Sequence, residues 1–281
     1  MEPGIKTTQP LSSILTQPQF GVGFLSTVPL RAIPSHKSEM VSQLLFAETF
    51  EILRKEEDWY KIKCSYDGYK GWVSESDVMP IDERNFIKIN SNSVFYVTEK
   101  VIAIQSVYKE RMLLFGSPLP FFDNKEFSFF DDKFRISGSV IDLTKTEPNP
   151  ELIVNLASKF LDVPYLWGGR SPFGVDCSGF SQMIYKLSNI RLPRDADQQE
   201  EGGELISDIA KAKTGDLAFF VNAKNNVSHV GILLNNNQII HASGRVRIDS
   251  IDKKGIYDAR LHKYTHKLYS IKRFFDENPP I

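Results

Sequence analysis

Residues 165–180 read YLWGGRSPFGVDCSGF and lead into a predicted helix. Asp176 suits the N-cap of that helix, because its carboxylate can accept hydrogen bonds from the free amides of the first turn. Cys177 then lies in the first turn, where the partial positive charge is expected to lower the pKa of a thiol and favour the nucleophilic thiolate. The same free amides could bind an oxyanion. Position alone favours a small buried cysteine that closes a helix end over a nucleophile.

Two of the five histidines, His229 and His241, stand at the ends of predicted strands. The polar run at 235–237 between them predicts a hairpin turn. If this run forms the loop, position 231 faces 241, and the two histidines are diagonal neighbours on one sheet face, about 7–8 Å apart. A register shift of one residue would separate them. In the first register His229 can act as the base and His241 can orient it; otherwise they are polar residues at strand ends.

The segment from 150 to 277 has the pattern of one α+β domain. Residues 151–163, ELIVNLASKFLDV, predict an amphipathic helix, with Pro150 in its first turn. A second helix follows Cys177, and its apolar face is formed by Phe180, Met183, Ile184 and Leu187. Strands dominate after that, at 216–221, 229–234, 238–243, 245–251 and 268–275. Helices followed by strands, without alternation, predict an antiparallel sheet.

The first half of the chain has a different texture, made of short apolar runs separated by polar turns. Residues 21–82 include FEILRKEEDWYKIKCSY, which predicts a hairpin, and residues 85–146 repeat the pattern. We therefore expect two small all-β barrels ahead of the α+β domain. Residues 1–20 are polar and rich in Pro, Gln and Thr, which indicates a loose arm.

The bulk numbers exclude several classes of partner. The chain has 281 residues, a length that suggests more than one domain, and a net charge of -1. This near-neutral balance gives no electrostatic reason to expect binding to nucleic acid or to an anionic membrane. No apolar run approaches the ~18 residues needed to span a bilayer, and the N-terminus lacks the pattern of a secretory signal. We expect a cytoplasmic protein, or a periplasmic or extracellular one if a leader was removed.

Cysteine and histidine spacing gives no support for a metal site. Neither CxxC nor HExxH occurs, so we expect no metal and no organic cofactor. The two cysteines, Cys64 and Cys177, leave a single disulfide between distant segments as an alternative to a free nucleophile.

The quoted motif, together with SHVGILL at 228–234 and IIHAS at 239–243, resembles the NlpC-type cysteine peptidases of the NlpC/p60 superfamily, which cleave bacterial cell-wall peptides. The resemblance covers about residues 150–275. It implies a papain-like fold, in which the helix with the cysteine packs on an antiparallel sheet with the histidines. It assigns the nucleophile to Cys177, the base to His229, the third catalytic place to His241, and a position near the oxyanion to Tyr165.

Two barrels ahead of such a domain resemble the SH3-like domains of the bacterial γ-D-glutamyl-L-diamino acid endopeptidases. LPRDADQQ at 192–199 is similar to the pocket segment of this subgroup, where an Arg-Asp pair helps to fix the free amino end of an L-Ala-γ-D-Glu peptide. The resemblance implies substrate contacts from Asp176, Ser178, Arg194 and Asp195. Ala196 replaces a frequent serine, so a hydroxyl contact is lost there. Without the resemblance, Arg194 and Asp195 would be read as a solvated surface pair.

The subgroup also closes its pocket with an acid and a tyrosine from the first barrel. Local similarity points to Glu39 and Tyr69, with Tyr66 and Trp72 as competitors for the aromatic role. A ligand ammonium among Asp176, Asp195 and Glu39 would find opposite charges, and a site built to pair a charged group rejects analogues without it.

These expectations combine into a cysteine endopeptidase that hydrolyses the amide between γ-D-Glu and a diamino acid in muropeptides with a free N-terminal L-Ala. The expected partner is a small peptide, the expected role is cell-wall peptide recycling, and we expect a monomer. One alternative is an endopeptidase or amidase that cuts intact peptidoglycan with the same Cys-His-His site. Another is a wall-binding module without catalysis.

Overall fold

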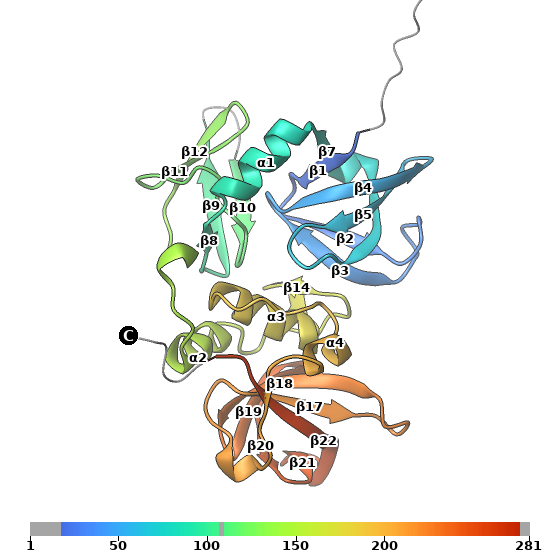
Figure 1. The fold of residues 1–281 in the computed structure, drawn as a ribbon, viewed down its shortest axis with the longest axis vertical. Coiled ribbons are helices and arrows are strands. Elements are labelled where there is room, and N and C mark those ends of the chain that lie inside the picture. The colour runs from blue at the N-terminus through green and yellow to red at the C-terminus, as the bar shows by residue number, and fades with distance from the viewer. Residues whose placement is uncertain (1–17, 107–109, 276–281) are drawn as a thin grey trace, which may run out of the picture.

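The computed structural model describes residues 18–106 and 110–275. Two β-rich units lie side by side at one end of the molecule, and a layer of helices over a sheet forms the other end (Figure 1). The expected arm at 1–20 falls outside the described residues up to residue 17, and the first strand begins at Phe20. Within the described ranges, no helix has both the length and the apolar character needed to cross a membrane.

The first unit is an SH3-like antiparallel β structure with strand order β3-β2-β6-β5-β4-β1-β7. The predicted hairpin forms, with Phe50 paired to Cys64. Alternate residues of its second strand are buried, as expected for a sheet with one face on a core. The strands are β1 (Phe20–Gly23), β2 (Thr27–Arg31), β3 (Met40–Leu45), β4 (Thr49–Glu56), β5 (Trp59–Cys64), β6 (Lys70–Ser74) and β7 (Val78–Ile81).

The second unit consists of a four-stranded sheet, β10-β9-β12-β11, and a two-stranded sheet, β13-β8. It begins with helix α1 (Glu83–Asn92), an element that the sequence analysis did not predict. Asp82 caps this helix by accepting a hydrogen bond from the Asn85 amide at 2.7 Å. The strands are β8 (Phe95–Val97), β9 (Val101–Gln105), β10 (Glu110–Leu114), β11 (Glu126–Phe129), β12 (Asp132–Ile136) and β13 (Val140–Asp142). The predicted boundaries of the two barrels, 21–82 and 85–146, stay predictions.

The third unit is the expected α+β domain with an antiparallel sheet. Strands β17 to β22 pair in sequence order, and β22 also pairs with β17, so six strands close into a ring. They are β17 (Leu217–Val221), β18 (Val227–Asn235), β19 (Gln238–Ser243), β20 (Arg245–Asp252), β21 (Gly255–Asp258) and β22 (Lys263–Arg273). The short strands of this unit are β14 (Arg170–Ser171), β15 (Gly174–Val175) and β16 (Glu204–Leu205).

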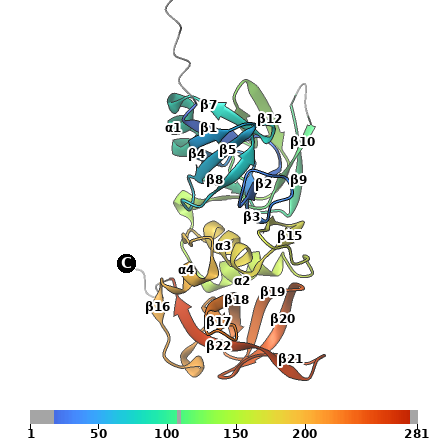
Figure 2. The same cartoon turned by 90° about the vertical axis from the view of Figure 1, so that its right-hand side faces the viewer.

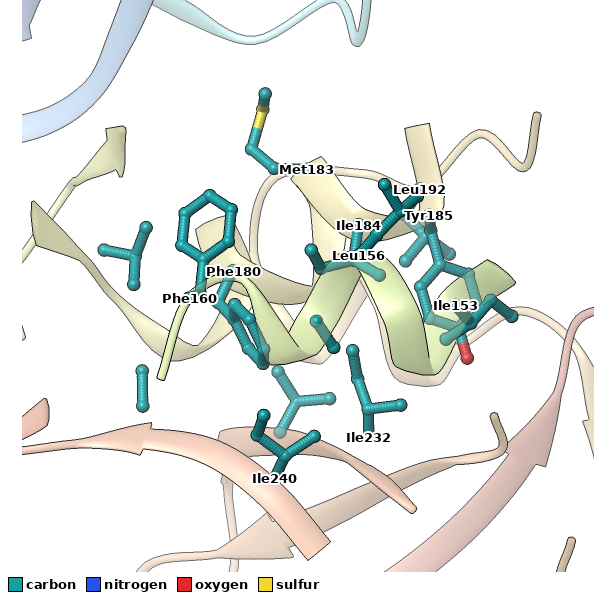
Figure 3. Packing of buried hydrophobic residues seen from close by; sticks show 14 of the residues in the cluster. Ile153, Leu156, Phe160, Phe180, Met183, Ile184, Tyr185, Leu192, Ile232 and Ile240 are labelled. Atoms are coloured by element: carbon teal, nitrogen blue, oxygen red, sulfur yellow. The ribbon is translucent and has the colours of Figure 1, made fainter. Parts of the chain in front are cut away.

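Helices α2 (Pro150–Ser158) and α3 (Cys177–Leu187) cover one face of this sheet, and the short α4 (Ala196–Glu200) follows. Both of the predicted helices are therefore confirmed. Figure 3 shows Phe180 and Ile184 of α3 packed with Leu156 of α2 above Ile232 and Ile240 of the strands. Every residue of α3 is buried, because the first barrel unit covers its other side (Figure 2).

The hairpin that carries the two histidines has the register favoured by the sequence. Gly231 faces His241, and the strands turn at 236–237 after a register shift between Leu233 and Asn235. The two histidines therefore lie on the same face of the sheet, as predicted.

A buried charge cluster joins the first barrel to the α+β domain. Glu48 accepts hydrogen bonds from Arg170 at 3.0 Å and from Lys186 at 2.7 Å, and all three side chains are almost fully buried. Burial raises the pKa of Glu48, but the charges on Arg170 and Lys186 outweigh it and hold the pKa at about 2. The cluster borders a cavity of about 410 Å³ between the units.

Candidate active site

The Cys177 thiol is fixed between the start of α3 and strand β18. Asp176 caps the helix by accepting a hydrogen bond from the Gly179 amide at 2.6 Å. The sulfur accepts backbone N–H groups of Val230 and Ser178. Because Val230 directly follows His229, the thiol lies against the backbone that carries the predicted base. Cys177 and Cys64 are both free, so the disulfide alternative is wrong.

Burial and the Asp176 carboxylate raise the pKa of the Cys177 thiol to about 12. The expectation of a lowered pKa at the helix start is therefore wrong for this site. The amide hydrogen bonds and the charge on Arg194 do lower the pKa of the thiol, but the loss of solvation raises it by more. At neutral pH the thiol keeps its proton and needs a base to become nucleophilic.

His229 has the properties of such a base. Its Nε2 lies 2.8 Å from Nδ1 of His241, so Nδ1 is the ring nitrogen of His229 that this hydrogen bond leaves available. The ring is 7% exposed and stacks on His266 of β22 at a centroid distance of 4.2 Å. Burial and the neighbouring His241 hold the pKa of His229 well below its usual value, so the imidazole is neutral at neutral pH.

Behind His241 stands an acid that the sequence analysis missed. Asp249 of β20 has its Oδ2 3.1 Å from Nε2 of His241 and 2.8 Å from the guanidinium of Arg247. The run RVRIDSI could have indicated this acid, because its alternation places Arg247 and Asp249 on one face of the strand. The pairing of His241 with Arg247 brings that face beside the histidines. His266 gave no comparable signal, because the register shift between Ile256 and Tyr257 decides its position.

The alternative interpretation of Arg194 and Asp195 as a solvated surface pair is wrong for Arg194. It is 1% exposed and binds Asp176 rather than Asp195, with two bonds at 3.0 and 2.6 Å. It also donates to Ser178 at 2.9 Å and to Ser42 of the first barrel at 3.1 Å. Asp176 further accepts the Gly168 amide at 2.8 Å, so both of its carboxylate oxygens are occupied.

A cavity of about 380 Å³ opens beside Cys177 and is lined by both the first barrel and the α+β domain. Among the described residues, no lysine or arginine borders the cavity. Four acids border it, namely Glu39, Asp176, Asp195 and Asp197. The sequence analysis named three of these four acids and missed Asp197.

The barrel residues proposed for the pocket do reach it. Glu39 accepts a hydrogen bond from the Trp167 indole at 2.6 Å, across the boundary between the two units. Tyr69 hydrogen-bonds with Asp195, and burial raises the pKa of both groups. Of the competing aromatics, Tyr66 lines the separate 410 Å³ cavity and Trp72 lines neither.

Tyr165 also lines the cavity beside Cys177. Burial and then the neighbouring Cys177 raise the pKa of its phenol, so the hydroxyl keeps its proton and can donate a hydrogen bond. In the part of the chain that the structure describes, no group of three or more His, Cys, Asp or Glu side chains has the arrangement of a metal site.

A cysteine at the start of a helix, packed against an antiparallel sheet that carries a histidine pair, is the arrangement of the papain-like cysteine peptidases. Comparisons with known proteins narrow this class. Residues 162–265 match the model of the NlpC/P60 family, and residues 30–78 match that of the bacterial dipeptidyl-peptidase SH3 domain. The chain is a cysteine peptidase that combines an NlpC/P60 domain with a bacterial SH3 domain.

Two relatives match this chain over most of its length. A γ-D-glutamyl-L-lysine dipeptidyl-peptidase of Bacillus subtilis (strain 168) is 27% identical over 72% of this chain and 71% of its own. Dipeptidyl-peptidase 6 of Lysinibacillus sphaericus is 24% identical over 80% of this chain and 89% of its own. The crystal structure of an NlpC/P60 family protein from Bacillus cereus superposes with a TM-score of 0.79, at 20% identity, over 92% of this chain and 100% of its own, and supports the fold.

Proposed function

We propose that this cysteine peptidase hydrolyses the amide between γ-D-Glu and a diamino acid in peptides that begin with a free L-Ala. The observation that carries the proposal is the acid-lined cavity beside Cys177, closed by Glu39 and Tyr69 of the first barrel. An ammonium group is the ligand that such a cavity favours, because it would pair the carboxylates. The name of the Bacillus subtilis relative describes a matching specificity.

In the proposed reaction, the Cys177 sulfur attacks the γ-carbonyl carbon of D-Glu while His229 takes the thiol proton. Tyr165, which lines the cavity, and an amide at the start of α3 would donate to the developing oxyanion. The C–N bond breaks, His229 returns its proton to the leaving amine, and an L-Ala-γ-D-Glu thioester remains on Cys177. A water molecule, deprotonated by His229, then hydrolyses the thioester and frees the thiol.

We assign the substrate ammonium to Asp195, Glu39 and Asp197. Asp176 borders the same space, but its two oxygens already bind Arg194 and backbone amides. Its contribution, with Ser178, is to hold Arg194 and the helix start in place. Asp195 is poised for the ammonium because it shares the cavity with Tyr69 and is only partly buried.

A requirement for a free L-Ala amine fits peptides that have already been released from the wall. We therefore propose that the protein recycles small wall peptides in the cytoplasm. An endopeptidase that cuts intact peptidoglycan with the same catalytic residues is the competing function.

The test is mass spectrometry of the products from L-Ala-γ-D-Glu-meso-diaminopimelate and from its lysine counterpart. We expect L-Ala-γ-D-Glu and the free diamino acid, no products with Cys177→Ala, and nearly normal turnover with the matched control Cys64→Ala. Cleavage at another bond, or full activity of Cys177→Ala, would overturn the proposed function.

A further inference from the structure

A chain of hydrogen bonds runs from the base to a carboxylate across three neighbouring strands. Nε2 of His229 on β18 lies 2.8 Å from Nδ1 of His241 on β19. Nε2 of His241 lies 3.1 Å from Oδ2 of Asp249 on β20. His241 is 0% exposed, so it has no water to exchange for these two partners.

Asp249 is held as a carboxylate by its surroundings. The Arg247 guanidinium donates to Asp249 Oδ2 at 2.8 Å and to Asp258 Oδ2 at 2.9 Å, so it is shared by two acids. Burial raises the pKa of Asp249, but the hydrogen bond from His241 and the charge on Arg247 outweigh it, and the pKa lies below its usual value. Burial lowers the pKa of His241, so its ring is neutral at neutral pH.

These states fix where each proton sits. A carboxylate can only accept, so Nε2 of His241 must carry a hydrogen. In a neutral ring the other nitrogen, Nδ1, then has a lone pair and accepts from Nε2–H of His229. His229 is neutral as well, so its Nδ1 is left with the lone pair that a general base requires.

We propose that Asp249 is a positioning residue that sets the proton positions of His241 and His229, so that the free lone pair of His229 is on Nδ1, the ring nitrogen that does not bond to His241. The opposite arrangement, with the hydrogen on Nδ1 of His229, would leave no acceptor for the thiol proton. Asp249 would also stabilise the imidazolium that forms during attack, through His241. This inference rests on the proposed roles of Cys177 and His229.

The test uses Asp249→Leu, which removes the acceptor but keeps the branched shape, and Asp249→Asn, which keeps an oxygen but loses the charge. We expect kcat to fall on the order of a hundredfold or more for both variants, with little change in KM. The asparagine amide can donate to Nε2 of His241 and so favour the opposite proton positions. Loss of an orienting carboxylate in comparable triads costs up to ~10⁴ in kcat. The matched control is Asp252→Asn on the same strand, whose carboxylate binds Tyr264 at the surface.

A nitrogen-15 NMR spectrum of the histidine rings gives a readout that does not depend on activity. We expect wild-type His229 to be unprotonated at Nδ1, and Asp249→Leu to lose that preference. A proton on Nδ1 of His229 in the wild type would overturn the inference even if the variants fail to fold. Wild-type kcat in a folded Asp249→Leu would overturn it too, whereas full activity of Cys177→Ala would instead count against the proposed function.

Discussion

At Cys177, burial raises the pKa of the thiol, whereas the amides at the helix start lower it. The sulfur accepts two amide hydrogen bonds, yet desolvation and Asp176 raise its pKa to about 12. His229, 7% exposed and stacked on His266, has its pKa shifted in the opposite direction, below its usual value. Both shifts keep the resting pair uncharged, so proton transfer from the thiol to His229 accompanies the attack on the substrate.

Alkylation tests the state of the thiol. We expect iodoacetamide to modify Cys177 slowly at pH 7 and faster as the pH rises, because the thiolate fraction increases toward the raised pKa. Peptide mapping should find Cys177 labelled before Cys64, since Cys177 lines the open substrate cavity, whereas Cys64 is buried and burial holds its pKa well above the usual value. Fast labelling of Cys177 that does not change between pH 6 and 9 would show a preformed thiolate.

The pH dependence of kcat/KM tests the state of the base. His229 must be neutral, and its pKa is depressed, so activity should persist below pH 6.5 and fall only when the pH drops through the depressed value. His266 is one of the neighbours that depress this pKa. His266→Ala should therefore move the acidic limb to higher pH, while His262→Asn, at an exposed turn, should not. An acidic limb that stays in place in His266→Ala would contradict the stacked arrangement.

At the scale of elements, the sequence predicted what depends on local pattern. The helix start at Asp176 and Cys177 and the register that pairs Gly231 with His241 follow from a cap and a period-two pattern, and the structure has both. Helix α1 was missed because its segment resembles the strands around it. Asp249 reaches the site through the pairing of β20 with the preceding strand β19, which the alternation of RVRIDSI indicated. The position of His266 depends on a register shift between β21 and β22, and no local pattern fixes that shift.

Glu48 of the first barrel binds Arg170 of β14 and Lys186 of α3, so its loss should lower the free energy of unfolding. Glu48→Gln leaves Arg170 and Lys186 buried without their carboxylate, which should lower the free energy of unfolding by about 3–5 kcal/mol. The control Glu51→Gln breaks an exposed pair with Lys63 and should cost under about 1 kcal/mol. Urea unfolding measures both, and equal effects would contradict the role of the cluster.

The same cluster should make the stability of the protein fall at acid pH. The pKa of Glu48 is lowered to about 2, so its contribution to stability is complete above the ordinary value of 4.5 and is lost as the pH falls through about 2. In Glu48→Gln this part of the acid destabilisation should be absent.

At the scale of the whole molecule, the substrate cavity needs both the first barrel and the α+β domain. Arg194 bonds to Ser42, Trp167 bonds to Glu39, and Tyr69 bonds to Asp195, each across the boundary. The barrel therefore forms one wall of the cavity. A preceding sugar or residue on the substrate would have to pass this wall.

Specificity for a free amine tests that wall. Acetylation of the L-Ala amine removes its charge and adds bulk, so Asp195 and Glu39 lose their partner. Substrate binding would cover Asp195 and Glu39, and a covered polar group left unpaired costs a few kcal/mol. We therefore expect kcat/KM for the N-acetyl peptide to fall on the order of a hundredfold or more. Comparable rates on free and acetylated peptides would favour an open cleft and the wall-cutting alternative.

The central claim is that Cys177 takes the L-Ala-γ-D-Glu acyl group from the substrate. Rapid acid quenching during turnover of L-Ala-γ-D-Glu-meso-diaminopimelate, followed by mass spectrometry of the intact protein and its peptides, tests it most directly. We predict a thioester adduct with the mass of the L-Ala-γ-D-Glu acyl group on the peptide that contains Cys177, and none in Cys177→Ala. An adduct on another residue, or one that carries the diamino acid, would contradict this mechanism.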